Sequence, residues 1–109
     1  MTAGGTTEKL KLIIVIAVAE LWNRLQADLV ALGVRDYTFM SVDGFGEHEP
    51  RERGLLLVTS NVRVETIIRP ELGDVVLKYL VVHYTRHELV AYASEVERSS
   101  DCVSLDVLR

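Results

Sequence analysis

The nine residues from Leu10 to Val18, LKLIIVIAV, are the stretch that decides the fold. Ile and Val dominate it and helix-forming sequence follows at once, so we predict a buried first strand that leads directly into a helix. Lys9 and Lys11 before an apolar run that closes on Ala17-Val18-Ala19 also resemble a secretory signal. That alternative is weaker, because the run from Leu12 to Ala19 is short for a signal core and far below the ~20 residues that span a bilayer.

The rest of the chain alternates between helical and strand patterns. Four leucines recur at helical spacing before Gly33, which suits the left-handed end of a helix. These leucines are Leu21, Leu25, Leu29 and Leu32. Alternating residue types predict strands over 37–43, 62–69 and 89–96, and Pro70 predicts the start of a second helix that runs toward Arg86. We expect the inward stripe of this helix to consist of Leu72, Val75, Val76, Tyr79 and Val82 or His83.

The order strand, helix, strand, strand, helix, strand predicts an α+β domain of the ferredoxin-like βαββαβ class. Its four-stranded antiparallel sheet would carry two helices on one face and a long loop between the second and third strands. Residues 10–98 would form this domain, with a flexible leader over 1–9 and an extension over 99–109 that includes a short strand at 103–107. Two helices cover one face of a sheet, so we expect the other face to pack against further copies of the chain.

Composition narrows the class of protein. A length of 109 residues suits one domain, and 49% hydrophobic residues supply enough material for a core. The net charge of −4 and the lack of a long Lys and Arg run argue against a nucleic-acid partner. The single cysteine, Cys102, cannot form an internal disulfide, which favours a reducing, cytoplasmic location.

The sequence carries no pattern typical of an enzyme. A Gly-x-Ser-x-Gly motif is absent, and the paired carboxylates fall on predicted strands or loops, so we expect a protein without catalytic residues. His83 and His87 are four residues apart, a spacing that places two imidazoles on one helical face and can hold a metal. No third ligand is evident nearby, so we expect no metal cofactor and keep this pair as an alternative.

Gly44-Phe45-Gly46 directly follows the second predicted strand. This segment is too short for a dinucleotide-binding motif, but its glycines allow close approach of the backbone to a ligand, and free N–H groups there can bind an anion. With Thr38 on the same strand and basic residues such as Arg98 elsewhere, the pattern is compatible with a phosphate-bearing ligand. An equally good interpretation is that these glycines only allow the chain to turn after the strand and bind no ligand.

Residues 33–46, GVRDYTFMSVDGFG, with a charged loop and then VRVE at 62–65, resemble the P-II signal-transduction proteins. The resemblance covers about residues 10–98. The stretch 78–96 and the Tyr-Thr-x-Met sequence at 37–40 are most similar to the P-II-like branch tied to inorganic carbon, the SbtB-type and carboxysome-associated proteins. The resemblance implies a ferredoxin-like homotrimer whose long loop, the T-loop, signals to a protein target such as a membrane transporter or a component of carbon metabolism.

The resemblance also implies a ligand site. Family members bind adenine nucleotides in clefts between subunits. Thr38 matches the threonine beside the adenine, Gly44 and Gly46 match backbone positions near the nucleotide, and Ile67 matches an apolar wall. The nucleotide-binding residues expected on this basis are Thr38, Gly44, Phe45, Gly46, His48, Ile67, Arg86, His87 and Arg98.

The chain departs from the family at the turn before the last strand. Ordinary P-II proteins have a glycine- and lysine-rich turn there, whereas residues 84–88 read YTRHE. We therefore expect ADP, AMP or cyclic AMP rather than ATP, with bicarbonate as a co-ligand. Two alternatives stay open: a metal-handling protein on the same scaffold, similar to CutA proteins, and a structural trimer with a degenerate cleft. The metal ligands to test would be His83, His87, His48 and Cys102.

Overall fold

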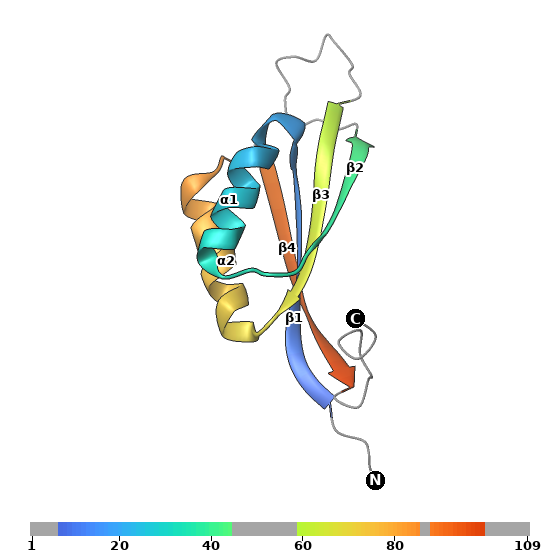
Figure 1. The fold of residues 1–109 in the computed structure, drawn as a ribbon, viewed down its shortest axis with the longest axis vertical. Helices are drawn as coiled ribbons and strands as arrows, with labels where there is room; N and C mark the ends of the chain where they lie inside the picture. The colour runs from blue at the N-terminus through green and yellow to red at the C-terminus, as the bar shows by residue number, and fades with distance from the viewer. Residues whose placement is uncertain (1–6, 45–58, 86–87, 100–109) are drawn as a thin grey trace.

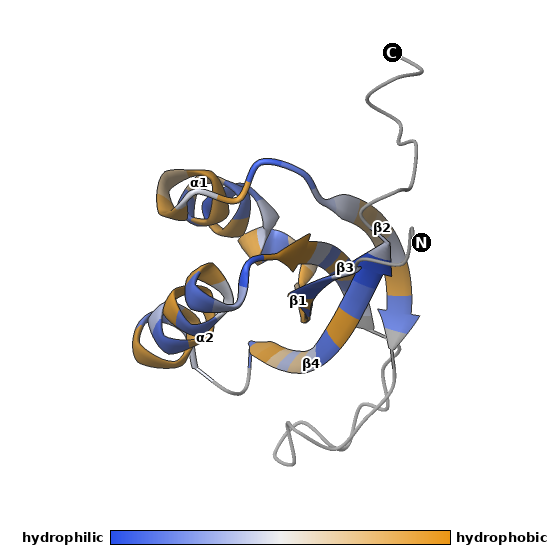
Figure 2. Ribbon diagram, turned by 90° about the horizontal axis from the view of Figure 1, so that it is seen from below, coloured by the Kyte–Doolittle hydropathy of each residue, from blue (hydrophilic) through white to orange (hydrophobic). Residues whose placement is uncertain are grey.

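A computed structural model describes residues 7–44, 59–85 and 88–99 and has its elements in the predicted order (Figure 1). They are β1 (Thr7–Val18), the short 3-10 helix η1 (Ala19–Leu21), α1 (Trp22–Leu32), β2 (Thr38–Gly44), β3 (Thr59–Ile68), α2 (Pro70–His83) and β4 (Leu89–Ser99). The strands form one antiparallel sheet in the order β2-β3-β1-β4. Both helices lie on the same face of this sheet (Figure 2). The predicted ferredoxin-like α+β class is therefore confirmed.

The apolar core lies between the sheet and the two helices. β1 pairs with β3 on one side and β4 on the other, and its residues Ile13, Val15 and Ala17 are at most 1% exposed. Their neighbours in β3 include Val62 and Val64, which are also buried. The helices contribute Leu25, Leu29, Val76 and Leu80. Burial of each such aliphatic side chain is worth about 1.5–3 kcal/mol, so this layer holds the helices on the sheet.

The predicted leucine stripe of α1 faces this core, where Leu25 and Leu29 are fully buried. The helix ends at Gly33, whose φ of 113° lies in the left-handed region that favours glycine. The N–H of Gly33 donates to the carbonyl of Val30 and satisfies one of the last turn's acceptors. The chain then turns through residues 34–37 into β2, at the end of the sheet that carries the candidate site.

The predicted inward stripe of α2 is partly wrong, because Val75 and Val82 are 50% and 68% exposed and His83 is exposed as well. The buried residues of this helix are Gly73, Val76 and Leu80. Since the middle of α2 is apolar on almost every side, apolar periodicity does not determine its rotation about its axis. The rotation is determined instead by the close approach of Gly73 to β1, because a Cβ at this position would lie 3.1 Å from Cδ of Lys11.

Several element boundaries differ from those predicted. Residues 7–9, assigned from the sequence to a flexible leader, lie in β1 and pair with residues 97–99 of β4, so the two strands continue as a ribbon beyond the helices (Figure 1). α2 ends at His83 rather than near Arg86. The strand predicted at 103–107 lies outside the described residues. No described helix is long and apolar enough to cross a membrane.

No described element covers the sheet face opposite the helices, called the open face below (Figure 2). Exposed apolar side chains lie on this face. Its central strand contributes Leu12, Ile14, Ile16 and Val18, all partly exposed. Cross-strand neighbours on this face include Met40, Ile67, Val90 and Tyr92, which are 36–57% exposed. A contiguous apolar surface of this kind is typical of an interaction face, which agrees with the expected packing against other copies.

Candidate functional site

A hollow of about 300 Å³ opens where β2 begins and β3 ends, at the edge of the open face. Three arginines, Arg35, Arg69 and Arg98, line it together with the carboxylate of Asp36. The other lining residues are Leu10, Gly33, Ile67, Ile68 and Leu72. We call this feature the arginine hollow. It combines a mainly aliphatic floor with guanidinium groups, the composition of a site for an anion.

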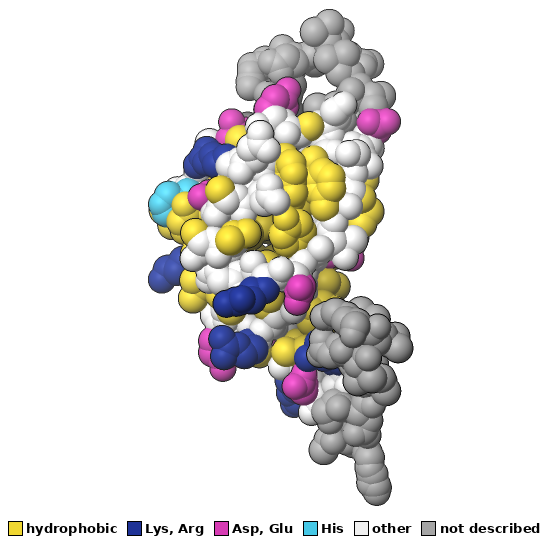
Figure 3. Space-filling model, in the orientation of Figure 1, with side chains coloured by type: hydrophobic (Ala, Val, Ile, Leu, Met, Phe, Trp, Pro, Cys, Tyr) yellow, Lys and Arg dark blue, Asp and Glu magenta, His cyan; other side chains and the backbone are white. Residues whose placement is uncertain are grey.

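The local fold explains why these arginines meet. Arg35 lies in the turn that follows the left-handed cap of α1, and Arg69 lies between the last residue of β3 and Pro70, the first residue of α2. Arg98 lies in β4 opposite Glu8, which is two residues along β1 from Leu10, and both Leu10 and Arg98 line the hollow. Two turns and one strand end therefore each contribute an arginine to the lining of one hollow. Figure 3 shows several Lys and Arg side chains, with Asp and Glu between them, on one face of the molecule.

The three arginines differ in their partners. Arg98 donates from Nη2 to Oε1 of Glu8 at 2.7 Å. The side chains of Arg35 and Arg69 are exposed and form no hydrogen bond or ion pair with any residue in the described part of the chain. Neither guanidinium group is paired within the described residues, and among the described residues that line the hollow Asp36 is the only one with a negative charge.

The structure brings two of the predicted nucleotide-binding residues together, since Ile67 and Arg98 both line the arginine hollow. Ile67 is 49% exposed, so its side chain is accessible to a ligand. Thr38 begins β2 opposite Glu65 and therefore lies on the open face, two residues along β3 from the position of Ile67. Thr38 does not itself line the hollow, but it lies on the same face at the same end of the sheet.

Gly44 lies at the opposite end of β2. It is six residues beyond Thr38 in the same strand, which at roughly 3.3 Å per residue corresponds to about 20 Å. The structure therefore does not bring Gly44 to the arginine hollow. The remaining predicted site residues, Phe45, Gly46, His48, Arg86 and His87, lie outside the described residues.

Sequence reasoning missed Arg35, Asp36 and Arg69. A signal for them was available, because β2 and β3 are antiparallel neighbours and the connection into β2 must therefore lie beside the connection out of β3. Both connections carry an arginine: Arg35 precedes β2 and Arg69 follows β3. The predicted topology alone was enough to place these two charges close together.

The described residues do not support the alternative metal site. His83 stacks on Tyr79 with ring centroids 4.0 Å apart, and its Nδ1 lies 3.1 Å from the carbonyl oxygen of Tyr79. Within residues 7–44, 59–85 and 88–99, no group of three or more His, Cys, Asp or Glu side chains could hold a metal ion. The other three ligands to test under this alternative, His87, His48 and Cys102, lie outside these ranges.

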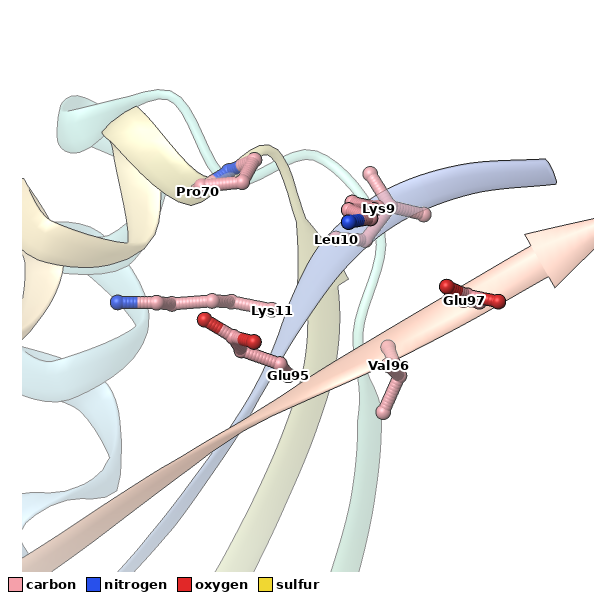
Figure 4. Close-up of a pocket in the computed structure, with 7 residues that line it drawn as sticks. All are labelled: Lys9, Leu10, Lys11, Pro70, Glu95, Val96 and Glu97. Carbon is pink, nitrogen blue, oxygen red and sulfur yellow. The ribbon is translucent and has the colours of Figure 1, made fainter.

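A second hollow, of about 410 Å³, borders the ribbon of β1 and β4 (Figure 4). Its charged residues form opposed pairs, because Lys9 faces Glu97 and Lys11 faces Glu95 in the strand register. Lys11 also forms a 2.7 Å ion pair with Asp74. The cations of this hollow are therefore balanced by carboxylates, which distinguishes it from the arginine hollow.

Residues 10–101 match the family model described as nitrogen regulatory protein P-II. The chain belongs to the P-II family. P-II proteins are signalling regulators, so this membership agrees with a protein that acts by binding rather than by catalysis. The P-II part of the predicted resemblance is thereby confirmed, whereas the inorganic-carbon branch stays a prediction. No curated protein matches the chain.

Solved P-II-like structures share the fold. A protein from Thermus thermophilus described as PII-like is 29% identical, with a TM-score of 0.66 over 84% of this chain and 89% of that one. CPII from Thiomonas intermedia, bound to ADP, AMP and bicarbonate, is 17% identical, with a TM-score of 0.69 over 84% and 94%. CPII bound to ADP and bicarbonate is 19% identical, with a TM-score of 0.70 over 88% and 94%.

Proposed function

We propose that this P-II protein senses an adenine nucleotide in the clefts between subunits of a homotrimer and signals through the segment between β2 and β3. The observation that carries the proposal is the common location of Thr38, Ile67 and Arg98 at one end of the open face. These residues offer a hydroxyl, an apolar wall and a cation on one accessible surface, which suits a base with a phosphate-bearing tail.

ADP, AMP or cyclic AMP is the proposed ligand. CPII, which has the same fold, is described with ADP, AMP and bicarbonate, and this supports the same ligand class and a bicarbonate co-ligand here. ATP is less suitable because residues 84–88 lack the glycine- and lysine-rich turn that ordinary P-II proteins use for a triphosphate. The shorter phosphate chain would be bound mainly by side chains such as Arg98.

A homotrimer is supported by the two free edges of the sheet. β2 and β4 are the edge strands of the described sheet, and contact between β2 of one copy and β4 of the next is heterologous, so three copies related by a threefold rotation would close a ring. An apolar groove of about 360 Å³ lies between α2 and β4, next to one of these edges. Its lining residues are Leu77, Leu80, Val81, Tyr84, Leu89 and Ala91. The open faces would meet around the ring axis and cover one another.

We propose that the target is a protein, either a membrane transporter or a component of carbon metabolism, as in the SbtB-type and carboxysome-associated branch. The support comes from the resemblance of residues 33–46 and 78–96 to that branch. Ligand in the cleft would change the conformation of the segment between β2 and β3, and the target would bind one of its conformations. The lone cysteine supports action in the cytoplasm.

Isothermal titration with ADP, AMP, cyclic AMP and ATP, each with and without bicarbonate, tests the proposal. Thr38→Val removes the hydroxyl and keeps the shape, so we expect about tenfold weaker binding of the best nucleotide. Ser41→Ala is the matched control, because Ser41 lies on the same strand but on the face toward the helices. Heat from none of the four nucleotides would reject nucleotide sensing and favour a structural trimer with a degenerate cleft.

A further inference from the structure

An aromatic cluster lies where α1 meets the edge strand β2, and we call it the aromatic corner. Trp22, the first residue of α1, packs on Phe39 with ring centroids 4.3 Å apart, and Tyr37 meets Trp22 edge-on at 5.8 Å. Nε2 of Gln26 donates to the hydroxyl of Tyr37 at 2.7 Å. Phe39 is nonetheless 40% exposed, although its partner in β3, Val64, is buried. A packed aromatic side chain that stays exposed at a sheet edge is typical of an interface anchor.

The other edge of the sheet carries a hollow of matching chemistry, the apolar groove of about 360 Å³ between α2 and β4. Val81 is 78% exposed in this groove, whereas Leu80, Tyr84 and Leu89 are buried. Ala91 contributes only a methyl group, which leaves room above β4. Among the lining side chains only the hydroxyl of Tyr84 is polar, and a carboxylate in α1 already accepts its hydrogen bond. The groove therefore suits an apolar occupant.

The strand register places the aromatic corner and the groove at the same level of the sheet. Cross-strand partners form one row from edge to edge, in the order Phe39, Val64, Val15 and Ala91. Partners in a row point to the same face, and the burial of Val15 and Val64 shows that this is the face toward the helices. In a ring whose open faces surround the axis, neighbouring sheets stand side by side at equal height. Phe39 of one copy would then lie beside Ala91 of the next.

We propose that the aromatic corner of one copy docks in the α2–β4 groove of the next, with Trp22 and Phe39 as the anchors. The inference rests on the proposed homotrimer and adds the helix-side contact that holds it and the direction of that contact. Aromatic side chains bury about 150–250 Å² each and dominate the binding energy of many interfaces. A head-to-tail ring pairs every aromatic corner with a groove, whereas pairing of like surfaces leaves the grooves empty. A charged partner does not fit, because none of the six residues that line the groove carries a charge.

Val81→Asp tests the groove without changing the aromatic corner. The new carboxylate would lie in water in a single chain and would be buried without a partner in the ring, so we expect the full-length variant to lose the trimer in light scattering. Trp22 is the only tryptophan of the chain, so its fluorescence should shift to longer wavelength as its ring becomes exposed to water. Val82→Asp is the matched control, because Val82 is the next residue of α2, is 68% exposed and lies outside the groove. This control should keep the mass and the emission of wild type.

Phe39→Ala tests the same contact from the other side. Loss of an anchor ring should raise the concentration at which the trimer dissociates about tenfold or more. Val30→Ala removes an apolar side chain that is 57% exposed on α1 outside the aromatic corner, and it should leave this concentration unchanged. Circular dichroism checks that every variant is folded.

The outcomes separate this docking from the homotrimer itself. The docking is overturned, and the homotrimer stands, if wild type is a trimer and both Val81→Asp and Phe39→Ala keep its mass and its concentration dependence. Loss of the trimer in Val81→Asp without a change in the emission of Trp22 would also overturn it, because Trp22 would then lie outside the contact. Wild type that stays a single chain at every concentration would reject the homotrimer and the docking together.

Discussion

Tyr84 shows how a single buried side chain joins the two helices. It follows α2, is 7% exposed, and its hydroxyl donates to Oδ2 of Asp28 in α1. Arg24 lies over its ring, with Cζ 4.2 Å from the ring centroid, and donates to the carbonyl of His83 at 2.7 Å. Burial and the hydrogen bond to Asp28 both raise the pKa of Tyr84 above its ordinary value.

Tyr84→Phe should lower the free energy of unfolding by about 1–2 kcal/mol at neutral pH, because Asp28 loses its donor. The raised folded-state pKa means that this tyrosine stabilises the fold fully below its unfolded pKa of about 10, and that the stability falls as pH rises above that value. The deficit of Tyr84→Phe against wild type should therefore shrink by about 1 kcal/mol between pH of about 9 and 11. Urea unfolding of wild type and variant at both pH values measures this deficit in the free energy of unfolding. An equal deficit at both pH values would contradict the predicted effect of Tyr84 ionisation.

At the scale of the element, α2 shows where apolar periodicity stops being informative. The existence and start of this helix follow from Pro70 and the apolar residues after it, but its rotation was misjudged at Val75 and Val82. The inward faces of β1 and β3 were easier to predict, because a strand has only two faces. In β3, Val62, Val64 and Thr66 alternate with charged residues. A helix that is apolar on several sides needs a tertiary contact to fix its rotation, and Gly73 supplies one.

Gly73→Ala tests this contact. In an exposed helix the change would stabilise by about 1 kcal/mol through helix propensity. Here the new Cβ would lie 3.1 Å from Cδ and 3.2 Å from Cβ of Lys11, and the 2.7 Å ion pair of Lys11 with Asp74 would be displaced. We expect net destabilisation of about 1 kcal/mol by thermal or urea unfolding. In a Lys11→Ala background the same change should cost less, and equal costs in both backgrounds would refute the contact.

At the scale of the whole molecule, the sequence predicted the layers and the open face, but only two of the nine residues that line the arginine hollow. Ile67 and Arg98 were singled out because they match family positions, while Arg35 and Arg69 match none that was considered. Their meeting depends on two connections at one end of the sheet, which follows from topology rather than from any local motif. The segments that hold Phe45, Gly46, His48, Arg86 and His87 are outside the described residues.

The open face should hold the subunits together if the homotrimer forms as proposed. Val90→Asp places a carboxylate on this face, at a side chain that is 40% exposed in the single chain. We expect this variant to fall from about three times 12.2 kDa to a single chain, because a buried, unpaired charge between subunits costs several kcal/mol. Val82→Asp is the matched control on the exposed side of α2, where Val82 is 68% exposed, and it should stay trimeric. Light scattering coupled to size-exclusion chromatography measures both masses, and circular dichroism checks that both variants fold. A trimeric Val90→Asp variant would show that the subunits meet through another surface.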